Sequence, residues 1–181
     1  MRQNLKLKHD LEEIFRTSNS PDELFDAFRA AIEKKIHDED LYKILLRNKA
    51  LSADEISMFA EKICREFSSL SYNICYCVGQ LFESISSYGK YHDRAFLYYQ
   101  KAAACKSSLH QPYLAISKMY NAEFNIPKFE SIVQVIEDGL PKVDLKSSIY
   151  FSLANLYKKF GDNEKSNDYQ KLGEIYQREG K

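Results

Sequence analysis

Apolar residues recur at spacings of three and four along nearly the whole chain, and no stretch sustains the two-residue alternation of a β-strand. Two helix starts share one signal, since Ser20 is followed by Pro21 and Glu23, and Ser52 is followed by Glu55. Apolar stripes and start signals together predict ten helices, over residues 4–17, 21–36, 38–48, 52–67, 71–87, 91–105, 110–122, 127–140, 146–160 and 163–178. We therefore expect an all-α fold.

The links between these helices are only a few residues long. Short links join antiparallel neighbours, so ten helices predict five antiparallel hairpins in series. The chain has only six glycines and four prolines, which argues against a turn-rich β fold. No stretch has the composition of a linker, and we expect one domain over residues 1–181.

An internal repeat runs through the second part of the chain. Residues of similar kind return at matching places in alternate helices: Ala95, Tyr98, Tyr99 and Ala102; Ile132, Ile136 and Gly139; Ser166, Tyr169, Gln170 and Gly173. The intervening helices match one another as well: Cys75, Val78, Gly79 and Phe82; Tyr113, Ile116, Ser117 and Tyr120; Tyr150, Leu153, Ala154 and Tyr157. Small residues at such places let helices approach closely, while the large residues fill the space beside them.

This pattern resembles the tetratricopeptide repeat, and the stretch from Ile149 to Gly173 is the best match. Gly161 stands at the turn of that stretch, where a left-handed residue ends a helix. The resemblance covers residues 71–176 and implies three repeats within 71–178, in a right-handed superhelical stack of hairpins. The related Sel1-type repeat is a variant of the same expectation. Residues 1–70 then form degenerate hairpins or a cap.

In the tetratricopeptide architecture the first helix of each hairpin lines a concave groove. The resemblance therefore implies a partner-binding face made of Tyr76, Gln80, Glu83, Leu114, Lys118, Asn121, Phe151, Asn155 and Lys158. Aromatic, amide and charged side chains together suit a peptide partner, and the alternative is an ordinary wet surface. The tyrosines at positions 98, 113, 120, 150, 157 and 169 fall instead on helix-packing places.

The resemblance also allows a negative expectation. Members that clamp the C-terminal carboxylates of chaperones carry lysine, asparagine and arginine at set places, because a carboxylate needs charged donors. Here those places hold Tyr76, Gln80, Ala115, Ser148 and Ser152. We therefore do not expect a receptor for chaperone tails.

Charge and motifs exclude several other classes. Lysine plus arginine and aspartate plus glutamate both number 26, so the basic excess typical of a nucleic-acid binder is missing. The sequence contains no phosphate-binding glycine motif and no hydrolase or zinc-protease motif. The four cysteines include no C-x-x-C pair, and the run from His37 to Asp40 fits the acidic start of a helix. We expect no enzyme, no metal and no cofactor.

The first residues contain no apolar segment of the signal-peptide kind, and no apolar run approaches the length of a membrane span. A cytoplasmic protein with no membrane partner is the resulting expectation. We expect a non-enzymatic adaptor that binds a peptide segment of another protein. The rival is a self-assembling homo-oligomer, because Tyr169, Leu172, Ile175 and Tyr176 lie in a last helix with nothing after it to cover them.

Overall fold

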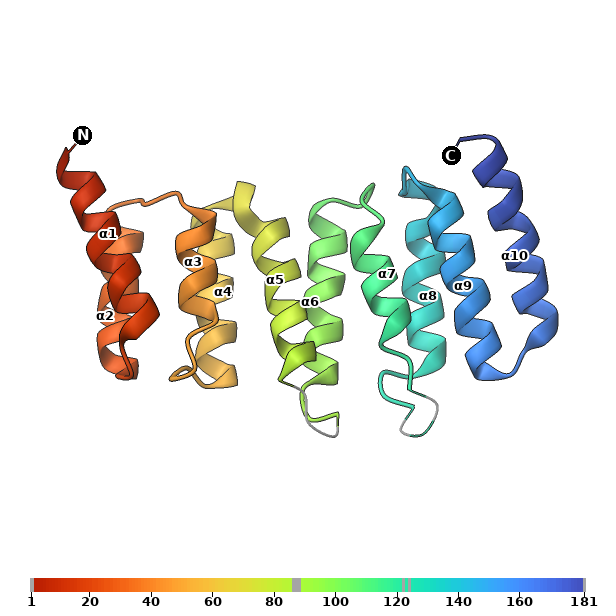
Figure 1. Ribbon diagram of the computed structural model, residues 1–181, viewed down its shortest axis with the longest axis horizontal. Coiled ribbons are helices and arrows are strands. Elements are labelled where there is room, and N and C mark those ends of the chain that lie inside the picture. The colour runs from red at the N-terminus through yellow and green to blue at the C-terminus, as the bar shows by residue number, and fades with distance from the viewer. Residues whose placement is uncertain (1, 86–88, 122, 124, 181) are drawn as a thin grey trace. The chain divides into compact units, whose positions relative to one another are not determined.

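A computed structural model of the protein describes residues 2–85, 89–121, 123 and 125–180. Within these residues the chain is all-α, with no strand, as the sequence predicts (Figure 1). The ten α-helices are α1 Arg2–Thr17, α2 Pro21–Glu33, α3 Glu39–Leu46, α4 Ala53–Glu66, α5 Ser71–Ser84, α6 His92–Cys105, α7 Gln111–Lys118, α8 Phe129–Gly139, α9 Lys146–Phe160 and α10 Asn163–Arg178. Two short 3-10 turns, Ser68–Leu70 and Leu140–Lys142, precede α5 and follow α8.

One helix end differs clearly from its prediction. The sequence predicts a helix to residue 122, but α7 ends at Lys118. The next backbone N–H, of Met119, bonds to the carbonyl of Ile116 in a tighter turn. Further on, Asn121 Oδ1 accepts a hydrogen bond of 2.8 Å from the backbone N–H of Glu123. An asparagine side chain that bonds to the backbone competes with helix continuation, which explains the early end.

The chain divides into two compact units, Met1–Leu81 and Phe82–Lys181. The boundary falls inside α5, about ten residues later than the sequence-based division between the N-terminal hairpins and the repeats.

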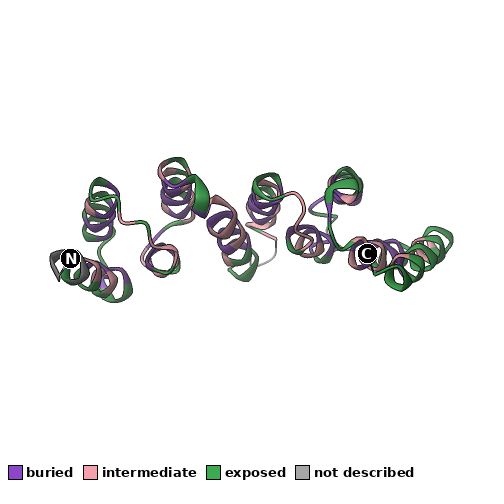
Figure 2. Ribbon diagram, turned by 90° about the horizontal axis from the view of Figure 1, so that it is seen from above, coloured by how far each residue is buried: buried purple, intermediate pink, exposed green. Residues whose placement is uncertain are grey.

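The first unit consists of consecutive helix pairs, in which α1 packs on α2 and α3, and α3 packs on α4. Its buried apolar side chains include Leu11, Phe15, Leu24, Phe28, Leu41, Tyr42, Leu45, Ile56, Phe59 and Ile63. The buried sides of these helices face neighbouring helices and the exposed sides face outward (Figure 2).

Both predicted helix starts are present in the first unit. Ser52 forms a complete capping box, since its side chain accepts from the N–H of Glu55 and the Glu55 carboxylate accepts from the N–H of Ser52. Ser20 likewise accepts from the N–H of Glu23. The carboxylate of Glu23 does not mirror that of Glu55. It accepts a hydrogen bond of 2.6 Å from the hydroxyl of Ser18, where the carboxylate of Glu55 accepts from the N–H of its own capping serine.

The second unit continues the pattern of neighbours, with α6 on α7, α7 on α8 and α9, and α9 on α10. Each helix thus packs on the next one or the next but one, an arrangement compatible with a helical repeat. Four of the six tyrosines predicted to pack between helices are buried, Tyr98, Tyr113, Tyr120 and Tyr157, and the other two are half-buried.

Two glycines of the second unit stand where helices approach closely, as predicted. A Cβ on Gly139 would lie 2.1 Å from the ring of Tyr113, and a Cβ on Gly173 would lie 2.6 Å from the ring of Phe151. Gly161 has a φ of 99° and ends α9 in the left-handed region, which confirms the predicted turn. Gly139 therefore sets the spacing of α7 to α8, and Gly173 sets the spacing of α9 to α10.

Candidate partner-binding site

Three of the nine predicted binding residues line one hollow. Lys118 of α7 and Asn155 and Lys158 of α9 surround a space of about 490 Å³. We call it the lysine hollow, and its complete lining is Ser117, Lys118, Ser152, Asn155, Leu156, Lys158 and Lys159. The direct packing of α7 on α9 places these side chains together.

Two serines join the helices at the base of this hollow. Ser117 is buried and its hydroxyl donates a hydrogen bond of 2.9 Å to the carbonyl of Leu114. A second hydrogen bond links the hydroxyls of Ser117 and Ser152. Because the Ser117 proton already lies on a carbonyl, Ser152 is the donor in this second bond. The pair therefore links α7 directly to α9.

The charge around the lysine hollow has one sign. Lys118, Lys158 and Lys159 are exposed, and none of the three forms an ion pair with any residue in the described part of the chain. The sequences of α7 and α9 contain no aspartate or glutamate. Acidic residues of this unit lie instead on helices such as α8 and α10. A negatively charged ligand would meet no like charge from either helix that forms the hollow.

The attraction of lysines to helix ends explains only part of this pattern. All three lysines lie in the last turns of α7 and α9, where the helix dipole favours positive charge. That effect falls off within one turn. It therefore does not account for the absence of acidic residues over the whole length of both helices.

The first predicted set, on α5, lies at the boundary between the two units. Tyr76 is half-buried and stacks on Tyr72, with ring centroids 6.0 Å apart. Burial, with a smaller contribution from Tyr76, raises the pKa of Tyr72. Gln80 and Glu83 are exposed, and the Glu83 carboxylate accepts a hydrogen bond of 2.5 Å from the hydroxyl of the buried Tyr99. This hydrogen bond joins Glu83 to α6, so Glu83 stabilises the first helices of the second unit.

The remaining three predicted residues lie outside the lysine hollow. Leu114 is half-buried on α7, and Asn121 follows the end of that helix and turns the loop after it. Phe151 is half-buried on α9, against the position of Gly173 on α10. Its place there gives it a packing role.

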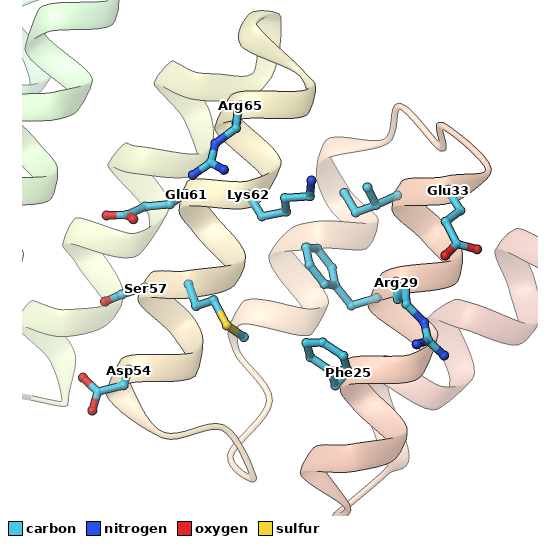
Figure 3. A pocket seen from close by; sticks show the side chains of 11 residues that line it. Phe25, Arg29, Glu33, Asp54, Ser57, Glu61, Lys62 and Arg65 are labelled. Atoms are coloured by element: carbon cyan, nitrogen blue, oxygen red, sulfur yellow. The ribbon is translucent and has the colours of Figure 1, made fainter.

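A second hollow, which the sequence analysis did not predict, lies between α2 and α4 of the first unit (Figure 3). We call it the apolar groove. Its volume is about 670 Å³, and its lining is Phe25, Phe28, Arg29, Ile32, Glu33, Asp54, Ser57, Met58, Glu61, Lys62 and Arg65. A signal was present in the sequence, since Met58 falls outside the apolar stripe that Ile56, Phe59 and Ile63 form on its helix.

Within residues 2–85, 89–121, 123 and 125–180, no three histidine, cysteine, aspartate or glutamate side chains gather in a way that could hold a metal ion. None of the helices among these residues has both the length and the apolar character needed to cross a membrane.

No protein-family model matches this chain, and no curated protein and no solved structure matches it either.

Proposed function

We propose that the protein is a non-enzymatic interaction module of the tetratricopeptide type, which binds an extended acidic segment of another protein in the lysine hollow. The observation that carries the proposal is the set of three lysines around one hollow, beside the Asn155 amide, none of them in an ion pair with a described residue. Ammonium and amide groups donate hydrogen bonds to carboxylates, and charged donors make the stronger ones.

Several packing features support the tetratricopeptide assignment. Helices pair with their successors, Gly139 and Gly173 stand opposite large aromatic rings, and Gly161 makes the tight turn between α9 and α10. Family members that bind peptides use the first helix of each hairpin. In the same numbering of hairpins, α7 and α9 are first helices, which is why we place the partner there.

The test uses a fluorescent peptide of about ten residues, rich in glutamate and aspartate, with the glutamine and asparagine version as its neutral counterpart. Binding is followed by anisotropy with the wild type and with a double variant, Lys118→Gln and Lys158→Gln. The matched control is Lys128→Gln with Lys142→Gln, two exposed lysines of the same unit that lie outside the lysine hollow. Both double variants carry the same net charge.

We expect the acidic peptide to bind the wild type and the control equally, and to bind the hollow variant about tenfold more weakly or worse. We expect the neutral peptide not to bind. Equal loss in both double variants would indicate attraction to overall charge alone, and would contradict the proposed site. A preference for a single-stranded oligonucleotide over the acidic peptide would contradict the proposed class of partner.

A second candidate function is self-assembly, because Leu172 and Ile175 of α10 are 37% and 49% exposed. The two side chains follow one another by three residues, and so form one small apolar strip on the last helix. Sedimentation equilibrium distinguishes this candidate. A mass that rises with concentration in the wild type and stays monomeric in an Ile175→Ser variant would favour it.

A further inference from the structure

The apolar groove of the first unit has an apolar floor and a charged rim (Figure 3). Phe28 and Ile32 form the buried part of the floor, whereas Phe25 and Met58 remain 45% and 46% exposed on facing helices. Large apolar side chains gathered within a polar rim are typical of protein-binding surfaces. The lysine hollow has the opposite character and lies in the other unit.

We propose that the apolar groove binds an amphipathic helix of a partner protein. Its walls are two helices, and a helix satisfies its own backbone hydrogen bonds internally. An extended segment lying on the apolar floor would find no hydrogen-bond partner in the side chains of Phe25, Ile32 or Met58, and its N–H and C=O groups would be buried unpaired, which is costly. A helix avoids this cost, because it enters with its backbone groups already paired.

The length of the groove fits about two turns of such a helix. From Phe25 to Ile32, the apolar floor on α2 covers seven residue steps, or about 10 Å at 1.5 Å per residue. An incoming helix covers the same length between apolar residues at i and i+7, with a third at i+4 between them. Such a stripe would cover both Phe25 and Met58.

The rim indicates which charges the incoming helix carries. Arg29 and Lys62 already form ion pairs within their own helices. Glu33 of α2 and Arg65 of α4 have no ion pair with any described residue, and they lie on opposite walls at the same end of the groove (Figure 3). The rim of α4 also contains Asp54 and Glu61, which already interact with other groups. At the end of the groove where Glu33 and Arg65 lie, the complementary helix therefore has a basic residue toward α2 and an acidic residue toward α4.

The test uses designed fluorescent peptides of about 18 residues, with leucines at i, i+4 and i+7, lysines on one flank and glutamates on the other. Anisotropy titrations compare the wild type with Met58→Ser and with Leu97→Ser. Leu97 lies on α6 of the other unit and is also 46% exposed, so the control removes an equally exposed apolar side chain. We expect binding to fall about tenfold for Met58→Ser and to stay unchanged for Leu97→Ser.

The rim is tested by a charge reversal, Glu33→Lys. It should weaken the mixed-flank peptide about two- to fivefold and strengthen a peptide with glutamate on both flanks by a similar factor. Absence of saturable binding, or equal binding by Met58→Ser and Leu97→Ser, would overturn the proposal. So would a dimer that Met58→Ser dissociates, since a second copy would then be the occupant. Because all variants lie outside the lysine hollow, failure here leaves the acidic-peptide test unaffected.

Discussion

Substituting alanine for Gly139 tests the close approach of α7 and α8 most directly. Gly139 has φ −82° and ψ −32°, values that every residue adopts easily, so its backbone does not require glycine. The obstacle is Tyr113, whose ring would lie 2.1 Å from the new Cβ, when ordinary contacts begin at 3.4 Å. The ring would have to retreat by about 1.3 Å from a position in which it is 4% exposed.

Two opposing terms give the expected magnitude. Overpacking a well-packed site costs about 1–3 kcal/mol. Replacing glycine by alanine at a helical position returns about 0.5–1 kcal/mol of conformational entropy. The steric term is larger, so we expect Gly139→Ala to destabilise the protein by about 1–2 kcal/mol.

Urea unfolding followed by circular dichroism measures this difference, and a second background identifies its cause. In a Tyr113→Leu protein the ring is gone, so adding Gly139→Ala should be neutral or stabilising. Gly161→Ala is the control, because that glycine has a φ of 99° and a Cβ added to it would meet no atom within 4 Å. Its cost comes from the backbone and should be the same in both backgrounds. A Gly139→Ala protein as stable as the wild type would refute the steric explanation.

Three other substitutions have defined outcomes. Phe151→Ala should lower the urea midpoint by an amount equivalent to about 1–2 kcal/mol, because the ring of Phe151 packs against Gly173. An unchanged midpoint would show that the ring does not stabilise the fold, and would favour the predicted role of Phe151 in partner binding. Asn48→Ala should cost about 2 kcal/mol in the same assay, since its amide donates two hydrogen bonds of 2.9 Å to carbonyls at the end of α1. Two lysines hold the pKa of Glu66 at about 2, below its ordinary value of 4.5. The stability that this carboxylate contributes is present above pH 4.5 and is lost as the pH falls toward 2, so Glu66→Gln should show a smaller decrease in urea midpoint over that range.

The sequence predicted helices well because their signals are local. Caps at Ser20 and Ser52, the glycine turn at 161 and apolar spacing of three and four each act within one or two turns. The end of α7 was wrong by four residues, since it depends on how the Asn121 side chain bonds to the backbone beyond the helix. The spacing of apolar residues contains no information about that hydrogen bond.

The candidate site was predictable only in part, because a binding face depends on which helices lie side by side. Lys118, Asn155 and Lys158 lie together because α7 and α9 pack directly on each other. Phe151 is a different case. The repeat pattern placed its side chain on the predicted binding face. In the structure its ring lies beside Gly173 of α10, where the lack of a side chain leaves room for it. The apolar groove was missed because Phe25, next to the buried Leu24, looks like an ordinary core position in the sequence, and Met58 alone is an isolated exposed apolar residue.

A net charge of zero argues against a polyanionic partner for the whole chain, but it does not describe each surface. In the second unit, α7 and α9 carry lysines and no acidic residue, whereas α8 and α10 carry acidic residues. The net charge of the whole chain therefore does not reveal the basic hollow. Three lysines are still few for a nucleic acid. Neutralising about three phosphates gives a slope of log K against log salt near −3, compared with about −10 for a dedicated DNA-binding protein. A short acidic peptide lacks the condensed counterions of a nucleic acid, so its binding to the same three lysines should depend less steeply on salt, and this difference distinguishes the two partners even when both are retained at low salt.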